Sequence, residues 1–388
     1  MTTLAGTRIL LPTPHGDLVR HTLSPRSPVH DFLGGPPTSR IAYAAAHVVA
    51  DPHTEGPQVD WDATLAFRRH LWGLGFGVAD AMDTAQRGGG LGWADAKQLI
   101  ARSGAEARAI SARLVCGAMT DQLDGRSTLS LDDIVNAYLE QAEWIRTAGG
   151  TPVLMASRHL AQAARNADDY WHVYDRVLTQ LDEPVILHWL GRDFDPVMAT
   201  YWGSPDLDTA TDMVLRIIEQ HTRVVAGIKV SLLDQAREVD LRRRLPPGVR
   251  MFTGDDFNYE QLILGDDHGH SDALLGVFDA IAAPARAALA ALDAGNRAEY
   301  SRLLAPTVSM ARHLFTAPTS AYKTGVVFLA WLNGHQSHFQ MIGGAQTLRS
   351  VPHLVQLFLL ADRAGALADP PLAASRMKTL LSMAGIEN

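Results

Sequence analysis

A lysine inside an apolar run is the residue whose type and position most directly suggest chemistry in this sequence. The sequence contains Lys97, Lys229, Lys323 and Lys378 and no other lysine. Lys229 falls within residues 224–231, Val-Val-Ala-Gly-Ile-Lys-Val-Ser. Lysine is rarely buried without a partner, and removing its amine from water lowers its pKa. A buried lysine can therefore hold its amine in the neutral form, which is the form that attacks a carbonyl carbon to give a Schiff base.

The pattern of residues 224–231 predicts a β-strand with Lys229 on a mixed face. Side chains alternate between the two faces of a strand, so one face here is wholly apolar and can meet outer helices. The other face carries Val225, Gly227, Lys229 and Ser231, with the polar groups near the C-terminal end. The active sites of (β/α)₈ barrels lie at that end of the strands.

The elements that would position Lys229 alternate from residue 41 onward between short apolar runs and longer amphipathic segments. This alternation predicts β/α units around a parallel sheet. Eight such units in about 250 residues are typical of a (β/α)₈ TIM barrel, an α/β fold. No GxGxxG follows the first strand, which argues against a dinucleotide-binding open sheet. Strands are predicted at 41–50, 75–82, 114–119, 152–156, 185–190, 224–230, 249–253 and 273–279.

The predicted barrel covers residues 40–300 and has additions at both ends. Residues 1–39 are rich in Pro, Gly, Ser and Thr and predict an extended N-terminal arm with a short hairpin. Strand signals are sparse in residues 301–388, which predict a C-terminal helical extension. Such an extension packs on a barrel or builds an interface, so we expect a homo-oligomer. Its helices are predicted at 300–314, 324–333, 354–364 and 371–383.

Acidic residues allow other interpretations. An ion pair between Lys229 and Asp255 or Asp256 would make the lysine structural rather than catalytic. Residues 266–272, Asp-Asp-His-Gly-His-Ser-Asp, have the ligand types of a metal site. They lie between a predicted helix and the eighth predicted strand, and therefore at the N-terminal face of a barrel, away from its chemistry. We expect a polar loop there.

Composition narrows the class of protein. The chain has 388 residues, of which 47% are hydrophobic, which is ample for a large core. Its formal net charge of -8 argues against a general nucleic-acid binder. Cys116 is the only cysteine, which excludes an intramolecular disulfide and a thiolate-rich zinc site. No run approaches the roughly 20 apolar residues of a spanning helix. We expect a cytoplasmic protein without nucleic-acid or membrane partners.

The lysine segment also resembles a known family. Gly-Ile-Lys at 227–229 looks like the Schiff-base lysine strand of the dihydrodipicolinate synthase and N-acetylneuraminate lyase family of class I aldolases. The resemblance spans residues 41–340 and implies a TIM barrel, a lysine imine and a homo-oligomer. Three other segments are similar to that family: 51–63 to its first βα loop and helix start, 184–187 to its fifth strand, and Thr-Gly-Asp-Asp at 253–256 to the end of its seventh strand.

The resemblance suggests roles for further residues. His188 stands where the family has a catalytic tyrosine, and its imidazole can shuttle a proton or orient a substrate. Gly191-Arg192 is similar to a family Gly-Arg that binds a substrate carboxylate. The family's Gly-Thr-Thr-Gly-Glu loop is replaced by Met-Asp-Thr-Ala-Gln at 82–86. There Thr84 keeps a hydroxyl, whereas Asp83 would repel the carboxylate of a keto acid.

The leading hypothesis is a Schiff-base lyase or aldolase that acts on a small carbonyl substrate, either an oxo acid or a sugar derivative, without metal or cofactor. Two alternatives stay open. One is a metal-dependent barrel isomerase or aldolase with strand-end Asp and His ligands. The other is a non-catalytic barrel that binds a metabolite. The expected catalytic residues are Lys229, His188 and Thr84, and the expected substrate contacts are Asp83, Arg192, Ser231, Asp255 and Asp279.

Overall fold

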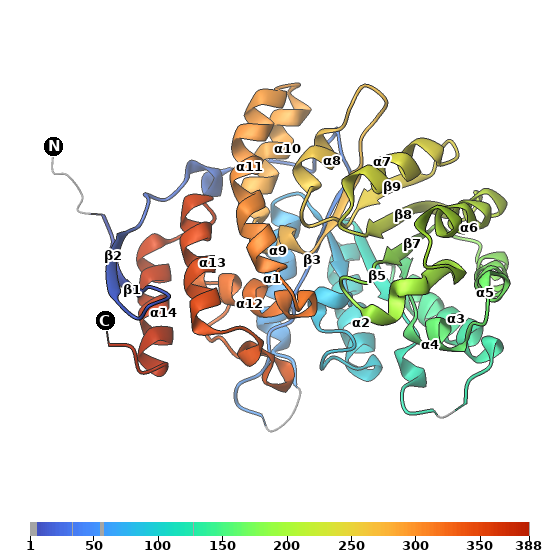
Figure 1. Ribbon diagram of the computed structural model, residues 1–388, viewed down its shortest axis with the longest axis horizontal. Helices are drawn as coiled ribbons and strands as arrows, with labels where there is room; N and C mark the ends of the chain where they lie inside the picture. The colour runs from blue at the N-terminus through green and yellow to red at the C-terminus, as the bar shows by residue number, and fades with distance from the viewer. Residues whose placement is uncertain (1–5, 33, 55–57, 127, 388) are drawn as a thin grey trace. The chain divides into compact units, whose positions relative to one another are not determined.

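The computed structural model describes residues 6–32, 34–54, 58–126 and 128–387, so Glu55 of the resemblance lies outside the described residues (Figure 1). Eight parallel strands close into a barrel in the order β10-β3-β4-β5-β6-β7-β8-β9. The predicted (β/α)₈ fold is therefore confirmed. The strands are β3 (Ala42–Ala45), β4 (Gly77–Asp80), β5 (Leu114–Ala118), β6 (Thr151–Leu154), β7 (Val185–Leu190), β8 (Val225–Ser231), β9 (Arg250–Thr253) and β10 (Asp272–Leu275).

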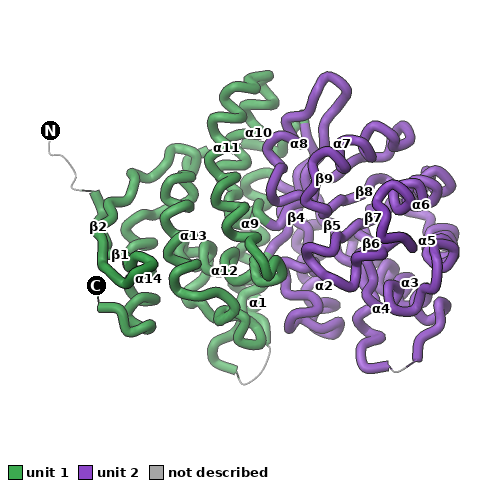
Figure 2. The backbone as a smooth tube through the Cα atoms, viewed as in Figure 1, with its two compact units in different colours: residues 1–39, 47–75, 277–388 green, residues 40–46, 76–276 purple. Residues whose placement is uncertain are grey.

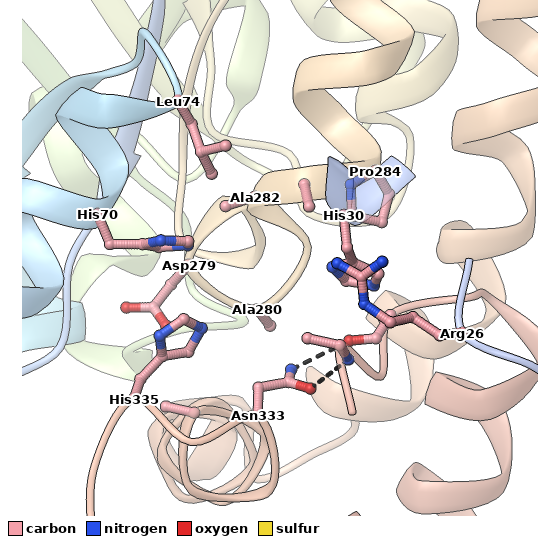
Figure 3. A pocket seen from close by; sticks show the side chains of 14 residues that line it. Arg26, His30, His70, Leu74, Asp279, Ala280, Ala282, Pro284, Asn333 and His335 are labelled. Carbon is pink, nitrogen blue, oxygen red and sulfur yellow. Dashed lines mark hydrogen bonds between the residues drawn. The ribbon is translucent and has the colours of Figure 1, made fainter. Parts of the chain in front are cut away.

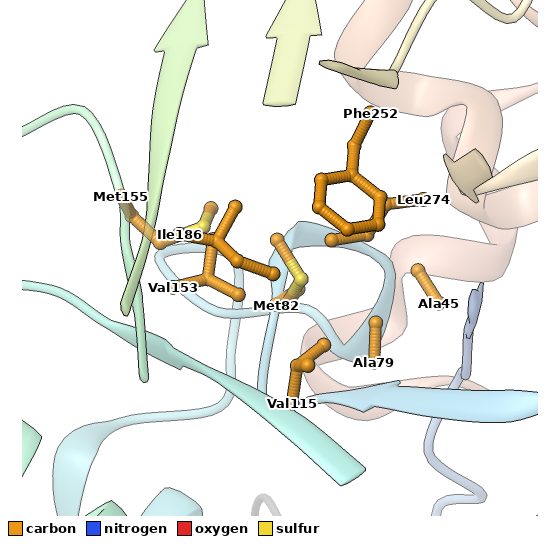
Figure 4. Packing of buried hydrophobic residues seen from close by; sticks show 9 residues of the cluster. All are labelled: Ala45, Ala79, Met82, Val115, Val153, Met155, Ile186, Phe252 and Leu274. Atoms are coloured by element: carbon orange, nitrogen blue, oxygen red, sulfur yellow. The ribbon is translucent and has the colours of Figure 1, made fainter. Parts of the chain in front are cut away.

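The barrel interior is filled by apolar side chains from seven of the strands and from the segments just after them (Figure 4). The buried members of this interior cluster on β3 and β4 are alanines, whereas those on β7 and β9 are larger. This cluster identifies which face of each strand points inward. Its buried members are Ala45, Ala79, Met82, Val115, Val153, Met155, Ile186, Phe252 and Leu274.

The chain divides into two compact units (Figure 2). We call residues 40–46 and 76–276 the barrel unit, and residues 1–39, 47–75 and 277–388 the helical unit. All eight barrel strands belong to the barrel unit. Its helices are α2 (Trp93–Ala109), α3 (Leu131–Thr147), α4 (Arg158–Ala163), α5 (Ala167–Gln180), α6 (Leu207–Gln220), α7 (Gln235–Arg244) and α8 (Tyr259–Leu264).

The helical unit contains the predicted N-terminal hairpin, in which β1 (Arg8–Pro12) pairs antiparallel with β2 (Leu18–Thr22). The four helices predicted for the C-terminal extension are also present, within a few residues of the expected bounds. In the described part of the chain, no helix is long and apolar enough to cross a bilayer. The helices are α1 (Trp61–Gly73), α9 (Val277–Ala280), α10 (Ala282–Asp293), α11 (Arg297–Leu314), α12 (Tyr322–Leu332), α13 (Val351–Arg363) and α14 (Pro370–Met383).

Three predicted strands are clearly shorter than expected, among them 75–82, of which β4 covers only Gly77–Asp80. Three helices, α4, α7 and α9, were not predicted. The first strand ends at Ala45 rather than residue 50. The apolar run 273–279 divides into β10 and the helical turn α9, because a continuous apolar run does not distinguish a strand from a buried helix. Helix α7 lacks the apolar periodicity that predicts a helix, because its buried residues are Glu238 and Leu241 and only one of them is apolar. Glu238 accepts hydrogen bonds from Thr253 (3.0 Å) and Ser271 (2.7 Å), and burial raises its pKa to about 8.

Candidate active site

Strand β8 places Lys229 on the inner face of the barrel. Lys229 is in register with His188 on β7 and with Phe252 on β9. Residues paired directly across neighbouring strands point to the same face of a sheet. Phe252 belongs to the interior cluster, and so does Ile186, two residues before His188. Lys229 and His188 therefore both face the interior.

The Lys229 amine is held without a direct ionic partner. In the described structure it makes no hydrogen bond and no ion pair, and its side chain keeps part of its surface accessible. Burial lowers its pKa to about 8, while the negative charges of Asp256 and Asp83 act in the opposite direction. At pH 7 about a tenth of such an amine is neutral, roughly three hundred times the fraction of an ordinary lysine.

The suggested ion pair between Lys229 and Asp255 does not form. One Asp255 carboxylate oxygen accepts the backbone N–H groups of Phe257 (2.8 Å) and Asn258 (3.0 Å). The other accepts the side-chain amide of Asn258 (2.8 Å). Burial raises the pKa of Asp255 despite these bonds. The carboxylate thus holds together the loop that follows β9.

His188 joins Lys229 and Ser231 in one cluster. Its Nε2 lies 3.2 Å from the Ser231 hydroxyl, and its side chain is buried. Its Nδ1 has no hydrogen-bond partner among the residues described. Burial, together with the positive charge of Lys229, holds the pKa of His188 well below its ordinary value. The imidazole is therefore neutral and has one ring nitrogen available for proton transfer.

Gly254 explains why the segment after β9 can lie against the lysine. A Cβ at this position would be 2.6 Å from Lys229 Cε, 2.2 Å from the Ser231 hydroxyl oxygen and 2.9 Å from the carbonyl oxygen of Val230. These separations are closer than van der Waals contact, so any larger residue must displace the lysine or the backbone. The glycine of the Thr-Gly-Asp-Asp motif is thus required by the space beside Lys229 and Ser231.

The loop after β4 brings Asp83 toward the amine. Ala81 has a positive φ of 50°, a conformation unusual for a non-glycine residue, and a short 3-10 helix over Asp83–Ala85 follows. The charge of Asp83 acts on Lys229. Thr84 is buried within the same turn. Sequence reasoning placed Asp83 and Thr84 near the lysine only through the family resemblance.

Arg192 and Asp279, two of the predicted substrate contacts, have described neighbours that do not include Lys229. Arg192 lines a cavity of about 730 Å³ in the barrel unit, together with Trp189, Tyr201 and Asn258. Lys229 and His188 are not among the described residues that line this cavity. Asp279 lies in α9 of the helical unit, where its carboxylate accepts a hydrogen bond from the imidazole Nδ1 of His47 (2.8 Å).

A hydrogen-bonded chain after β5 and β6 was not found by sequence reasoning. The Thr120 hydroxyl lies 2.7 Å from the Ser157 hydroxyl and 2.9 Å from His159 Nδ1. His159 Nε2 lies 3.2 Å from the carboxylate of Asp124, which is 72% exposed. These side-chain contacts therefore lead from buried hydroxyl groups to a solvent-exposed carboxylate, at the C-terminal ends of two strands. The residues come from separate loops, so no local sequence pattern predicts that their side chains are in contact.

The polar run 266–272 forms ion pairs. The Asp266 carboxylate contacts Arg242 (2.9 Å) and Arg243 (3.0 Å), and Asp272 contacts Arg250 (2.8 Å). Across the described residues, no three or more His, Cys, Asp or Glu side chains gather in a way that could hold a metal ion.

The eight strands define the class of protein by fold: the chain is a (β/α)₈ barrel, with Lys229 on the inner face of β8. It belongs to the DUF993 family, whose model is described as a protein of unknown function and matches residues 9–386. A search of curated proteins finds no significant match.

Solved structures of the dihydrodipicolinate synthase family share this fold. One is a prophage protein from E. coli K12 in complex with pyruvate, with 14% identity, a TM-score of 0.66, and coverage of 84% of this chain and 98% of that chain. The Aquifex aeolicus synthase has 12% identity, a TM-score of 0.64, and coverage of 84% and 99%. The Thermotoga maritima synthase has 13% identity, a TM-score of 0.63, and coverage of 85% and 100%. The resemblance inferred from the motifs is confirmed at the level of fold.

The lowered pKa predicts how the reactivity of Lys229 depends on pH. The neutral amine is the reactive form, so acylation of Lys229 should rise with pH and level off above a midpoint near 8. Asp256→Asn removes a charge that raises this pKa and should move the midpoint lower. Pulse acylation followed by peptide mass spectrometry measures both midpoints. A midpoint above 10 in the wild type would contradict the arrangement.

Gly254→Ala should reduce the acylation rate of Lys229 by at least tenfold at pH 8, because the new methyl group occupies the space beside Lys229 Cε. Gly92→Ala is the matched control, since a Cβ there meets no atom within 4 Å. Circular dichroism verifies that both variants fold. Equal acylation rates in the two variants would show that the close approach does not matter.

Proposed function

We propose that the protein is a Schiff-base-forming lyase or aldolase that cleaves or forms a bond next to the carbonyl of a small oxo acid or sugar-derived substrate. The observation that carries the proposal is the state of Lys229. Its amine faces the barrel interior, has a pKa lowered to about 8 and is not engaged in an ion pair within the described structure. A purely structural lysine would be expected to be paired with a carboxylate.

The chemistry begins when the neutral Lys229 amine attacks the carbonyl carbon. A proton moves from nitrogen to oxygen to give a carbinolamine, a proton from solvent converts its hydroxyl group to water, and departure of that water leaves a protonated imine. The positive imine then accepts the electron pair of the breaking bond between the α and β carbons, which gives an enamine and releases the second carbonyl product. Protonation of the enamine and hydrolysis by water restore the amine. The reverse order forms the bond.

His188 is suited to the proton transfers in this sequence. It is in register with Lys229, is neutral because of burial, and has an available Nδ1 in the structure described. A neutral imidazole can take the proton of a β-hydroxyl group as the carbon–carbon bond breaks and return it later. Ser231, next to Nε2, orients the ring. Thr84 is a candidate for a second proton relay.

The negative charges near Lys229 favour a substrate that has no carboxylate next to the reacting carbonyl. Asp83 and Asp256 both act on the amine, and both would repel a carboxylate attached to the reacting carbonyl. Arg192, which would offset that repulsion, lines the cavity of about 730 Å³, and Lys229 is not among the described residues of its wall. A neutral hydroxylated carbonyl compound therefore fits this site better than a simple keto acid.

Borohydride trapping tests the imine. Incubation with a panel of hydroxylated aldehydes and ketones and of keto acids, followed by reduction, should add the substrate mass to Lys229. Lys229→Ala should abolish the adduct, whereas Lys378→Ala, which removes an exposed lysine of α14, should not. Turnover of a compound that leaves no adduct on Lys229 would exclude the proposed mechanism.

His188→Gln separates imine formation from proton transfer. With a compound that is trapped on Lys229, this variant should still form the adduct but turn over about 100-fold more slowly, since general acid–base groups contribute at least that much. Steady-state kinetics and trapping are measured on the same preparation. Unchanged turnover would remove His188 from the proton path.

A further inference from the structure

The helical unit contains a second cavity, of about 130 Å³, which the proposed function does not use (Figure 3). Figure 3 shows the imidazoles of His70 and His335 beside the Asp279 carboxylate. His30, Arg26 and Asn333 also line the space. Most of the remaining wall consists of alanine side chains.

Asp279 has an unused hydrogen-bonding position. Its side chain is wholly buried, and its Oδ2 accepts hydrogen bonds from the backbone N–H and from the ring Nδ1 of His47, both at 2.8 Å. Its Oδ1 has no hydrogen-bond partner among the described residues. A buried carboxylate oxygen left unpaired is costly, so this oxygen indicates a ligand that donates a hydrogen bond.

The other polar groups of the cavity are mainly acceptors or already occupied. His30 donates through Nε2 to the carbonyl oxygen of Gly365 (2.9 Å), and burial lowers its pKa, so Nδ1 carries a lone pair. Burial also lowers the pKa of His70, and that of His335 to about 3. These rings are therefore neutral at pH 7. Arg26 is paired with Asp31 (2.7 Å), which offsets its charge.

The Asn333 side chain does not compete for a ligand. Its amide nitrogen donates to the carbonyl oxygen of Ala366 (3.0 Å), and its oxygen accepts the backbone N–H of Ala368 (2.8 Å). The cavity therefore presents an anionic acceptor and neutral imidazoles within an aliphatic wall. Its volume equals about four water molecules at roughly 30 Å³ each, so it has room for a molecule of about four or five heavy atoms.

We propose that this cavity binds a small aliphatic primary amine in its ammonium form. The ammonium group donates to Asp279 Oδ1, and the short carbon chain lies against the alanine side chains. An ammonium group supplies three donors and one positive charge, which match a buried carboxylate with a free oxygen. The inference is independent of the imine chemistry proposed for Lys229.

The test uses propylamine as the probe and 1-propanol as its uncharged analogue. Isothermal titration calorimetry at pH 7 should show propylamine binding to the wild type, with 1-propanol binding at least tenfold more weakly. Asp279→Asn should weaken propylamine binding at least tenfold, whereas Lys229→Ala should leave it unchanged. This pair of variants separates the inference from the proposed function.

Ala283→Leu provides a variant that leaves the Asp279 and His47 pair intact. Ala283 is a half-buried residue of α10 that lines the cavity, and leucine is a strong helix former that would fill the space. Propylamine binding should be lost while circular dichroism shows an unchanged fold. The inference is overturned if the wild type does not bind propylamine, if 1-propanol binds equally well, or if either cavity variant binds as the wild type does.

Discussion

The placement of an amine inside a closed barrel is the constraint on which the rest of this site depends. Desolvation disfavours the charged form of Lys229, and two carboxylates that act from a distance limit the loss. A direct ion pair would keep the lysine protonated, and the Asp255 carboxylate, one of the two candidate partners, bonds to its own loop instead. With a pKa of about 8, the Lys229 amine is mostly charged at pH 7, and about a tenth of it is neutral.

The regular part of the fold could be predicted because it repeats. Alternating apolar runs located all eight strands. The predictions failed where burial is polar or where a run is uniformly apolar. Helix α7 buries Glu238, whose hydrogen-bond donors are hydroxyl groups on distant segments of the chain. The spacing of apolar residues within the helix does not predict such burial.

The site was predictable only along single strands. Alternation placed Lys229 and Ser231 on one face, and the family resemblance added His188. Pairings between segments far apart in the sequence were not visible in the same way. Asp279 belongs to a pair with His47, 232 positions away, although its sequence position suggested the end of a barrel strand beside the lysine. The chain through Thr120, Ser157 and His159 was missed for the same reason.

Gly254 has a consequence for any attempt to redesign this barrel. A Cβ at position 254, just after β9, would fall in space already filled by Lys229 Cε and the Ser231 hydroxyl. The space around Lys229 therefore cannot be reshaped from position 254 by adding a larger side chain. Changes around the amine must instead come from β7, where His188 is in register with Lys229, or from the turn at Asp83, whose charge acts on the amine.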